Sequence, residues 1–393
     1  MILLGAKMSL SNKIRTFFKK IKALDKIISP GGLHQARNKL DPKLYKHLQN
    51  TILKTFYEEA KDENKKWKNN QIYAVDVSTI NLPKSEETLA FFSVQSNQSP
   101  TERVQGYGSF LYDVLNELPI NQELEAKQSE IKFVFDSHCD YYDKNTIVLY
   151  DRAYASNALV ALHKSLSVPC VIRCSTSSSF SIVSEFLKSD SFDSVYKLVI
   201  PKEKRIEWKK YNLPSSVNVR LIKVILSTGE VEVLLTTLLD QELYPLDDFA
   251  WLYHQRWKIE TYFDRLKNQL DVERFSSGFL LHIEQDFYAR VFMSALESIV
   301  IKSEQQILDQ ECDKKNTKYR YRINKSISYA ELHDEVIALL YDESIPIEEA
   351  YAEIRVLFRL SPSPIRPDNN APRVKKSASY QLWHQKYRKK TGH

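Results

Sequence analysis

The hydrophobic pattern divides the chain into a helical start, a strand-rich middle and a helical end. Residues 9–70 place apolar positions at helical spacing, and Asp41-Pro42 is typical of a helix start, with a capping residue before a first-turn proline. From residue 71 the pattern alternates and is rich in β-branched residues, as in QIYAVDVSTINLP, which predicts a strand. TLAFFSV and GYGSFLYDVL are further strand candidates.

The middle of the chain then predicts a strand, a helix and a strand in succession, in NTIVLYD, ASNALVALHKSLS and PCVIRCS. That order is typical of an α/β unit with a partly parallel sheet. Two β-branched runs around STGE predict a hairpin within a β-rich insertion at about 176–245. Long helices return from about residue 246, so we expect a mixed α/β sheet with flanking helices.

Composition narrows the function only a little. The 393 residues suffice for two or three domains, and a net charge of +6 fits a polyanionic partner without requiring one. Only 8 glycines and no glycine-rich phosphate motif argue against a nucleotide cofactor. The 4 cysteines form no C-x-x-C pair and are expected to be core thiols of a reducing compartment. No segment approaches the ~20 apolar residues of a membrane span, so we expect a soluble cytoplasmic protein.

The stretch LYHQRWKIETYFDRLKNQL, residues 252–270, predicts one amphipathic helix with a mixed group of functional side chains. Tyr253, Arg256, Glu260 and Lys267 fall within about 60° of one another at 100° per residue, beside the apolar stripe. A carboxylate at that rim is held rigidly and still faces a cleft. Alone, however, Arg256 and Glu260 could be an ordinary surface pair four residues apart.

Two further carboxylates lie at or near strand ends. Asp76 lies within YAVDVSTI, and Asp151 directly follows TIVLY and could alternatively cap a helix. With Glu260 they give three carboxylates from separate elements, a set that suits Mg²⁺. Two such ions activate an attacking oxygen and stabilise a leaving one at phosphorus. Arg256 would then hold phosphate oxygens together with Lys267, and the tyrosine of the helix would hydrogen-bond a phosphate or stack on a base.

These three carboxylates resemble the D-D-E triad of insertion-sequence transposases with a ribonuclease-H-like catalytic domain. The four helix residues match the Y-(2)-R-(3)-E-(6)-K signature of the group with a β-rich insertion before the glutamate. HQARNKLDPKLYKHL and YRYRINKSISY resemble flanking segments of that group, so the resemblance spans about residues 30–330. Val77 in DVST and Ala153 in DRAY stand where the group commonly has glycine.

The resemblance implies a ribonuclease-H-like fold divided as follows: a helical N-terminal DNA-binding domain at 1–70, the first part of the catalytic domain at 71–175, the insertion at 176–245, the catalytic helix region at 246–310, and a C-terminal helical and basic region at 311–393. By position, the metal-binding catalytic acids would be Asp76, Asp151 and Glu260. The DNA contacts near the scissile phosphate would be Tyr253, Arg256 and Lys267. The first helix would present a basic face made of Lys13, Arg15, Lys19, Lys20 and Lys22.

The implied activity is cutting of the element's ends and joining to target DNA, with two Mg²⁺ ions or Mn²⁺ as a substitute. Its partners would be the terminal inverted repeats and target DNA, and the protein would bind them as a homodimer. It would be a bacterial cytoplasmic protein, associated with the nucleoid when bound to DNA. Three basic segments, 201–210, 314–326 and 374–390, are candidates for backbone contact. Two alternatives remain open: a non-catalytic DNA-binding protein derived from a transposase, and another ribonuclease-H-like nuclease such as a resolvase.

Overall fold

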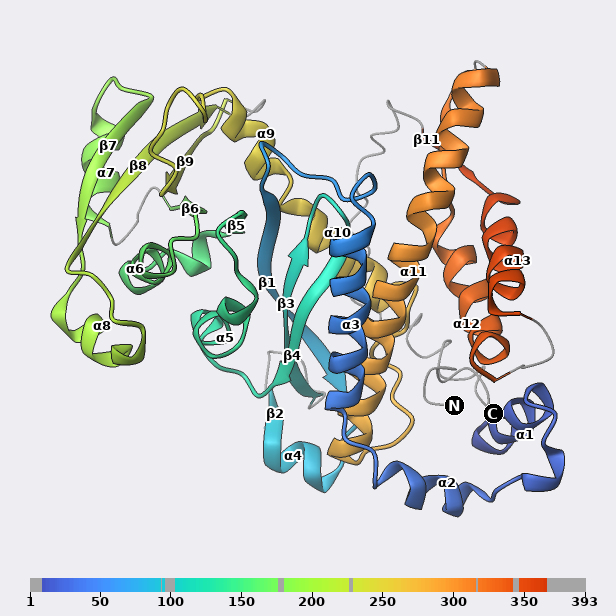
Figure 1. The fold of residues 1–393 in the computed structure, drawn as a ribbon. Coiled ribbons are helices and arrows are strands. Elements are labelled where there is room, and N and C mark those ends of the chain that lie inside the picture. The colour runs from blue at the N-terminus through green and yellow to red at the C-terminus, as the bar shows by residue number, and fades with distance from the viewer. Residues whose placement is uncertain are drawn as a thin grey trace. The chain divides into compact units, whose positions relative to one another are not determined.

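The computed structural model describes residues 9–92, 94–95, 103–175, 180–225, 229–315, 317–341 and 346–365 (Figure 1). The basic segment 374–390 lies outside these ranges. The chain divides into two compact units, Glu59–Asn268 and the combination of Met1–Glu58 with Gln269–His393. All four cysteines are buried free thiols. Among the described residues, no helix has the length and apolar character needed to span a bilayer.

Unit 59–268 is built on one mixed sheet. Nine strands of the described chain follow the order β2-β3-β1-β5-β6-β9-β8-β7, with β4 also paired to β3. Their bounds are β1 Gln71–Leu82, β2 Val94–Gln95, β3 Arg103–Asp113, β4 Leu118–Glu125, β5 Thr146–Tyr150, β6 Cys170–Cys174, β7 Asp193–Val199, β8 Ser216–Ile225 and β9 Val231–Thr236.

Strand directions identify the core of this sheet. β1 and β3 pair antiparallel, as do β3 and β4, whereas β1, β5 and β6 run parallel. The arrangement β4-β3-β1-β5-β6 with these directions is that of a ribonuclease-H-like sheet, and the expected mixed α/β class is confirmed. The segment 176–245 supplies β7, β8 and β9, which continue the same sheet antiparallel from β6.

Short helices connect and flank the strands of this unit. They are α4 Glu86–Phe92, α5 Glu130–Asp136, α6 Asn157–Leu166, α7 Ser181–Lys188, α8 Lys202–Glu207, α9 Asp248–His254 and α10 Trp257–Asn268, with 3₁₀ turns η3 His138–Tyr141, η4 Arg152–Tyr154 and η5 Lys209–Tyr211. The strand predicted at TLAFFSV is wrong for residues 88–92, which lie in α4; only Val94 of this segment belongs to a strand, β2. Thr88 N–H donates to Ser85 Oγ (3.2 Å) and Ser85 N–H to Thr88 Oγ1 (3.0 Å), a reciprocal cap that starts a helix.

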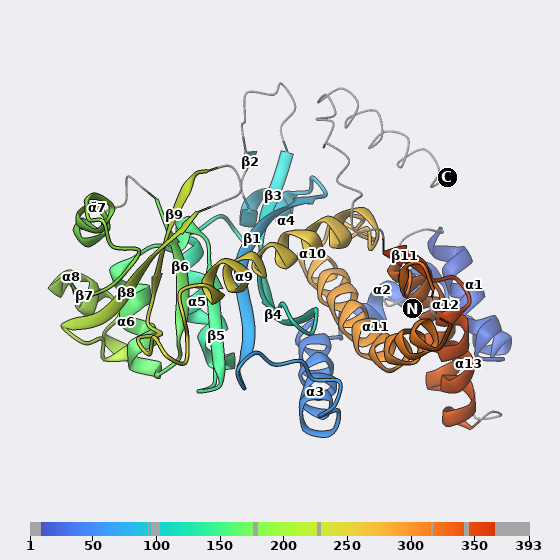
Figure 2. The ribbon, with the colours of Figure 1, turned by 90° about the horizontal axis from the view of Figure 1, so that it is seen from above.

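Helix α10 is anchored to β3 by aromatic packing. The ring of Tyr262 stacks on Tyr112 with centroids 4.7 Å apart and meets Phe110 edge-on at 5.7 Å. Phe263 meets the same Phe110 ring at 5.5 Å. Burying each such side chain stabilises the fold by about 1.5–3 kcal/mol. These contacts hold α10 against the sheet, where it also contacts β1 (Figure 2).

The second unit is helical. Its elements are α1 Leu10–Lys20, η2 Leu24–Lys26, α2 Pro30–Arg37, α3 Lys43–Glu59, α11 Leu280–Lys315, α12 Lys325–Tyr341 and α13 Ile347–Arg359, with a small pair of strands, β10 Arg320–Arg322 and β11 Ser363–Ile365. Asp41 starts α3 as predicted, because its Oδ1 accepts Lys43 N–H at 2.9 Å. The predicted exposure of Lys13 is wrong: that lysine is 7% exposed, and burial lowers its pKa to about 8.

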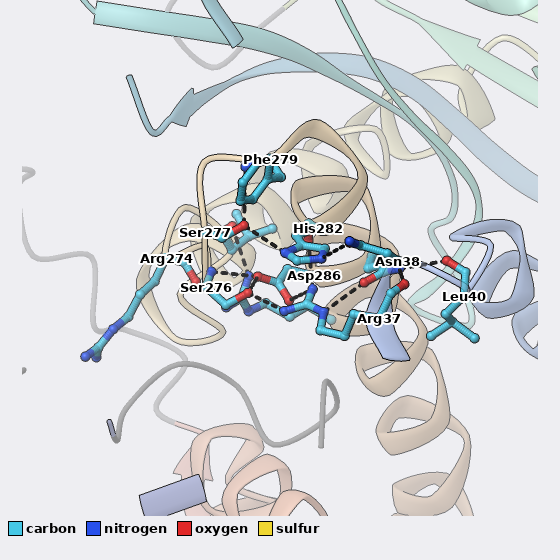
Figure 3. Close-up of polar contacts among 12 residues, drawn as sticks. Arg37, Asn38, Leu40, Arg274, Ser276, Ser277, Phe279, His282 and Asp286 are labelled. Atoms are coloured by element: carbon cyan, nitrogen blue, oxygen red, sulfur yellow. Dashed lines mark hydrogen bonds and ion pairs between the residues drawn. The ribbon is translucent and has the colours of Figure 1, made fainter. Parts of the chain in front are cut away.

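A polar network in this unit ties α2 to the start of α11 (Figure 3). The Arg37 guanidinium donates to Gln285 Oε1 at 2.9 Å, to Ser276 Oγ at 2.6 Å and to Asp286 Oδ1 at 3.0 Å. The other oxygen of Asp286 accepts from Ser276 N–H at 2.7 Å and from the serine hydroxyl at 2.6 Å. Gln285 in turn donates to the Arg37 carbonyl at 2.8 Å. Every guanidinium nitrogen of Arg37 and both carboxylate oxygens of Asp286 therefore have a hydrogen-bond partner.

Candidate active site

Asp76 lies in the middle of β1 and faces α10. It pairs directly with Phe110 on antiparallel β3, and residues opposite each other in such a pair point to the same face of the sheet. That face is covered by α10 through its contacts with Phe110. Asp76 Oδ1 accepts Val77 N–H at 2.8 Å, which fixes the carboxylate beside the strand.

Asp151 lies at the same level on the neighbouring strand. Ala74 pairs with Leu149 where β1 and β5 run parallel, and Asp76 and Asp151 each follow two residues later. Asp151 also has the capping role considered from the sequence, because its Oδ1 accepts Ala153 N–H at 2.7 Å at the start of η4. The strands thus bring two of the three predicted carboxylates side by side, at the carboxyl end of β5.

The segment 252–270 forms two helices, so the prediction of one continuous helix is wrong. α9 ends at His254 and α10 begins at Trp257. Between them the backbone tightens: Arg256 N–H bonds to the Tyr253 carbonyl at 3.1 Å, and Ile259 N–H to the Arg256 carbonyl at 3.1 Å. No glycine or proline marks this break in the sequence. Arg256 lies at the break and is only 4% exposed.

Arg256 connects two of the predicted carboxylates. Its Nη2 donates to Glu260 Oε1 at 2.7 Å, and its Nη1 lies 3.5 Å from Asp76 Oδ2. Its Nε is buried without a hydrogen-bond partner in the described part of the chain. Arg256 and Glu260, which the sequence alone allows to be an ordinary surface pair, are therefore not isolated, because Arg256 also contacts Asp76 in the middle of β1.

The electrostatics of this site favour added positive charge. The pKa of Asp76 is raised to about 7, chiefly by burial and to a smaller extent by the charges of Asp151 and Glu130, although the Val77 amide and Arg256 act to lower it. Burial acts to lower the pKa of Arg256, but the neighbouring Tyr253, Glu260 and Asp76 outweigh it and the pKa rises. One arginine therefore leaves the carboxylates incompletely neutralised.

Tyr253 and Lys267 occupy different environments. Tyr253 is 5% exposed and its hydroxyl has no hydrogen-bond partner among the described residues. Burial raises the pKa of this phenol, so it stays protonated and can donate. Because the ring is enclosed, this structure favours the hydrogen-bonding role over stacking on a base. Lys267 lies near the end of α10 and is half-buried.

The donor set suits a hard divalent cation, since carboxylate oxygens are the ligands that Mg²⁺ and Mn²⁺ prefer. Asp151 has no ion-pair partner among the described residues, so its charge is available to a cation. Over the same residues, no three His, Cys, Asp or Glu side chains stand close enough to hold a metal. Arg256 supplies the positive charge that links Asp76 to Glu260 in this structure.

Sequence reasoning missed several neighbours of this site. Glu130 and Tyr154 interact electrostatically with both aspartates, and the Tyr154 hydroxyl donates a hydrogen bond to Glu130. An Arg173–Glu232 ion pair (2.7 Å) lies close enough to affect Tyr253. Glu130 sits in SEIKFVFD, which reads as an ordinary helix start. Its position near the two aspartates follows only from the connection between β4 and β5, and that connection can be placed only when the strand order is known.

Neither departure from glycine strains the backbone. Val77 and Ala153 both have negative or extended φ values, since neither is among the residues with positive φ. Glycine is required only where φ is positive. The side chains at these two positions are therefore compatible with the local conformation.

Comparison with known proteins bears on this geometry. A family model described as "Transposase DDE domain" matches residues 67–296. No curated protein matches the chain. Among solved structures, a cryo-EM structure of the piggyBac transposase synaptic complex with hairpin DNA is similar, with a TM-score of 0.42 and 8% sequence identity. The similarity covers 81% of this chain and 62% of that one, so this chain spans less than two thirds of its length.

Proposed function

Because the chain belongs to the transposase DDE domain family, we propose that it is the DNA transposase of an insertion sequence. It cuts the ends of its element and joins them to target DNA by divalent-metal-dependent phosphoryl transfer. One observation carries the proposal: Asp76 and Asp151 lie at the same level on adjacent parallel strands, and Arg256 links Asp76 to Glu260.

Two divalent cations, Mg²⁺ or Mn²⁺, would be bound by the carboxylates of Asp76, Asp151 and Glu260. When bound, these ions activate an attacking oxygen and neutralise the leaving oxygen at phosphorus. The protein holds the carboxylates on a strand, a strand end and a packed helix, which fixes the reacting groups in position. Metals and positioning suffice for the chemistry, so no covalent protein–DNA intermediate forms.

Arg256, Lys267 and Tyr253 bind the DNA near the scissile phosphate. The guanidinium of Arg256 has an unused Nε that can donate a charge-assisted hydrogen bond to a phosphate oxygen. Tyr253 donates its unpartnered hydroxyl to a phosphate oxygen. Lys267, further along α10, contributes a point charge to the same backbone.

The partners are the terminal inverted repeats and target DNA, with two protomers pairing two ends. The basic segment 201–210 includes α8, where Lys202 and Lys204 are exposed, and 314–326 includes β10. Both can contact phosphates from the surface of their own unit. Such contacts make binding weaken steeply with salt.

The test uses DNA carrying the element's own ends, incubated with purified protein with and without Mg²⁺. Cleavage at the repeat boundary should require the metal and disappear in Glu260→Gln and Asp151→Asn, while both variants still bind the DNA. Replacing a metal-binding carboxylate should reduce the rate by about 10³-fold or more, some 4 kcal/mol in the barrier. Cleavage by Asp151→Asn at the wild-type rate would refute the triad.

A second candidate is a non-catalytic DNA-binding protein derived from a transposase. The observation that favours it is Arg256, which occupies Asp76 and Glu260 where a cation would bind. Binding to the ends with no cleavage in Mg²⁺ or Mn²⁺ would establish it. Cutting of branched DNA without strand transfer would instead indicate a resolvase-type nuclease.

A further inference from the structure

A cavity of about 330 Å³ lies at the end of the sheet where β6 and β8 begin. It is formed by the last turn of α6, the end of β7, the start of β8 and the segment that follows β9. Its polar lining residues are Lys164, Lys197, Ser216, Asn218 and Thr237, and the other two lining residues are aliphatic. None of these residues belongs to the candidate active site.

The cavity is well separated from the predicted carboxylates. Thr237 Oγ1 accepts the Cys170 N–H at 3.0 Å, which places the cavity beside the first residue of β6. Cys170 is level with Val148 on parallel β5, three residues before Asp151 and about 10 Å from it along the strand. Asn218 lies three strands across in the order β5-β6-β9-β8, about 14 Å away. One phosphate group therefore cannot contact both sites.

Two lysines give the cavity a positive charge that the protein does not neutralise. Lys164 and Lys197 are exposed, and neither has a hydrogen-bond or ion-pair partner among the described residues. No carboxylate lines the cavity in this part of the chain. The acid closest in sequence, Asp240, accepts the N–H groups of Glu242 and Leu243 at 3.0 and 2.9 Å. Both ammonium groups are therefore available to an anion from outside the chain.

Neutral hydrogen-bond donors lie beside these charges. Asn218 is directly opposite Lys197 in the antiparallel pair of β7 and β8, so the two side chains share one face of the sheet. Ser216 precedes Asn218 by two residues and points to the same face. Within the described ranges, neither the Asn218 amide nor the Ser216 hydroxyl has a hydrogen-bond partner. Two ammonium groups, an amide and a hydroxyl together suit an oxyanion.

The surroundings of the cavity favour a polyanion over an isolated small anion. α8 follows β7 directly and contacts α6, which supplies Lys164 to the cavity (Figure 1). Lys202 and Lys209, in and just after α8, are exposed and have no ion-pair partner among the described residues. The cavity thus continues a basic surface, and lysine is a common ligand of phosphate groups.

We propose that this cavity is a second phosphate-binding site, which takes the DNA backbone at a distance from the cleaved bond. Lys164 and Lys197 neutralise the phosphate, and Asn218 and Ser216 donate hydrogen bonds to its oxygens. The ligand chemistry, a phosphate oxyanion, follows from the cavity itself. Only the choice of DNA as its source rests on the proposed function. DNA held at two separate points is fixed in orientation as well as in position.

The test measures binding of the full-length chain to labelled duplex DNA carrying the element's ends, by fluorescence anisotropy at several salt concentrations. The double variant Lys164→Gln/Lys197→Gln removes both charges and nearly keeps the side-chain length. It should weaken binding about tenfold and reduce the slope of log Kd against log salt by about 1 to 2, since each phosphate contact accounts for about 0.9. A duplex of scrambled sequence should show the same loss, because backbone contacts carry no sequence information.

The matched control is Lys144→Gln. Lys144 is also exposed and without a partner among the described residues, and it precedes β5 at the same end of the strands but does not line the cavity. This variant should bind DNA within about twofold of wild type. Asn218→Ala should weaken binding about threefold without changing the salt slope, because it removes a hydrogen bond and no charge. All these variants should melt like the wild type, since the side chains make no polar contact that folding requires.

Inorganic phosphate is the second probe, and it distinguishes DNA from a free anion as the source. At constant ionic strength, phosphate in place of chloride should raise the melting temperature of the wild type more than that of the double variant. A lost phosphate effect with unchanged DNA affinity would overturn DNA as the source and leave a site for free phosphate.

The remaining outcomes separate this site from the proposed function. Wild-type DNA affinity, salt slope and phosphate effect in the double variant would overturn the cavity as an anion site. Equal weakening by Lys144→Gln would also overturn it, because the effect would be general electrostatics. DNA binding that depends on the two lysines, without any metal-dependent cleavage by the wild type, would refute the transposase activity and support the second site.

Discussion

Arg37 and Arg256 are both buried beside carboxylates, yet their surroundings differ in completeness. Each donor nitrogen of Arg37 has an acceptor, and both oxygens of Asp286 are hydrogen-bonded (Figure 3). Arg256 has one short bond to Glu260, one contact of 3.5 Å to Asp76 and an unpartnered Nε. A saturated network contributes to a unique fold, whereas an unsaturated one retains capacity to bind a ligand.

The largest expected effect separates the two arginines. Arg37→Met leaves the buried Asp286 without its cation and should lower the free energy of unfolding by about 3–5 kcal/mol. Arg256→Met should cost about 1 kcal/mol, because Glu260 remains 40% exposed and Asp76 can protonate. Urea unfolding checks both values, and DNA cleavage should fall about hundredfold in Arg256→Met.

The double variant Arg37→Met/Asp286→Asn is the control for this comparison. It removes both charges of the pair, so it should recover much of the stability lost in Arg37→Met. Equal destabilisation by Arg37→Met and Arg256→Met would abolish the distinction between a structural and a ligand-binding arginine.

A second saturated group, His163, is expected to make stability depend on pH. Its Nδ1 donates to the Val168 carbonyl at 2.9 Å and its Nε2 accepts from the Tyr150 hydroxyl at 2.9 Å. Burial lowers the pKa of His163 to about 4 from an ordinary 6.5. The stabilisation is complete above pH 6.5 and is lost as pH falls toward 4, by about 3 kcal/mol in total.

His163→Gln, which cannot titrate, isolates this contribution. The difference in unfolding free energy between wild type and variant should shrink as pH falls from 6.5 to 4. Asp76 acts with the opposite sign, because a carboxyl whose pKa is raised to about 7 gains protons on folding in this interval. That contribution is common to both proteins and cancels. A difference that stays constant with pH would contradict the assignment of His163 as the neutral, buried imidazole.

Two buried tyrosines extend the comparison between saturated and unsaturated polar groups, with an effect of intermediate size expected. The Tyr150 hydroxyl bonds to Tyr142 at 2.8 Å as well as to His163, whereas the Tyr253 hydroxyl has no partner among the described residues. Tyr150→Phe should therefore lower stability by about 1–3 kcal/mol. Tyr253→Phe should leave stability within about 0.5 kcal/mol and weaken binding to the DNA ends. Thermal unfolding measures the stability of both variants, and fluorescence anisotropy measures their binding to the DNA ends. A larger stability loss in Tyr253→Phe than in Tyr150→Phe would contradict the prediction.

The sequence predicted elements whose signal is local. Buried β-branched runs located β1, β5, β6 and the β8–β9 hairpin, and strand position located Asp76 and Asp151. One error arose where two local signals competed. At Ser85–Thr88 a reciprocal cap outweighed the apolar run that followed, and the cap was visible in the sequence.

Other features depend on contacts between distant residues and have no local signal. The break at Arg256 has no glycine or proline to mark it, and the helix that follows it packs on β3 through contacts with Phe110. The pairing of Arg37 with Asp286 joins residues 249 positions apart. Glu130 comes close enough to affect Asp76 and Asp151 only through the strand order, which periodicity does not determine. The positions of Asp76 and Asp151 on neighbouring strands could thus be predicted, but the residues that surround them could not.

The smallest expected effect concerns the two positions where the related transposases commonly have glycine. Val77→Gly and Ala153→Gly should each lower stability by about 0.5–1 kcal/mol, because neither residue has a positive φ and glycine adds freedom to the unfolded chain. Cleavage should stay within about threefold of wild type, since a glycine at either position keeps the backbone N–H group that bonds Asp76 or Asp151. A tenfold gain in cleavage by either glycine variant would mean that the site must adopt a backbone conformation different from this one when it binds DNA.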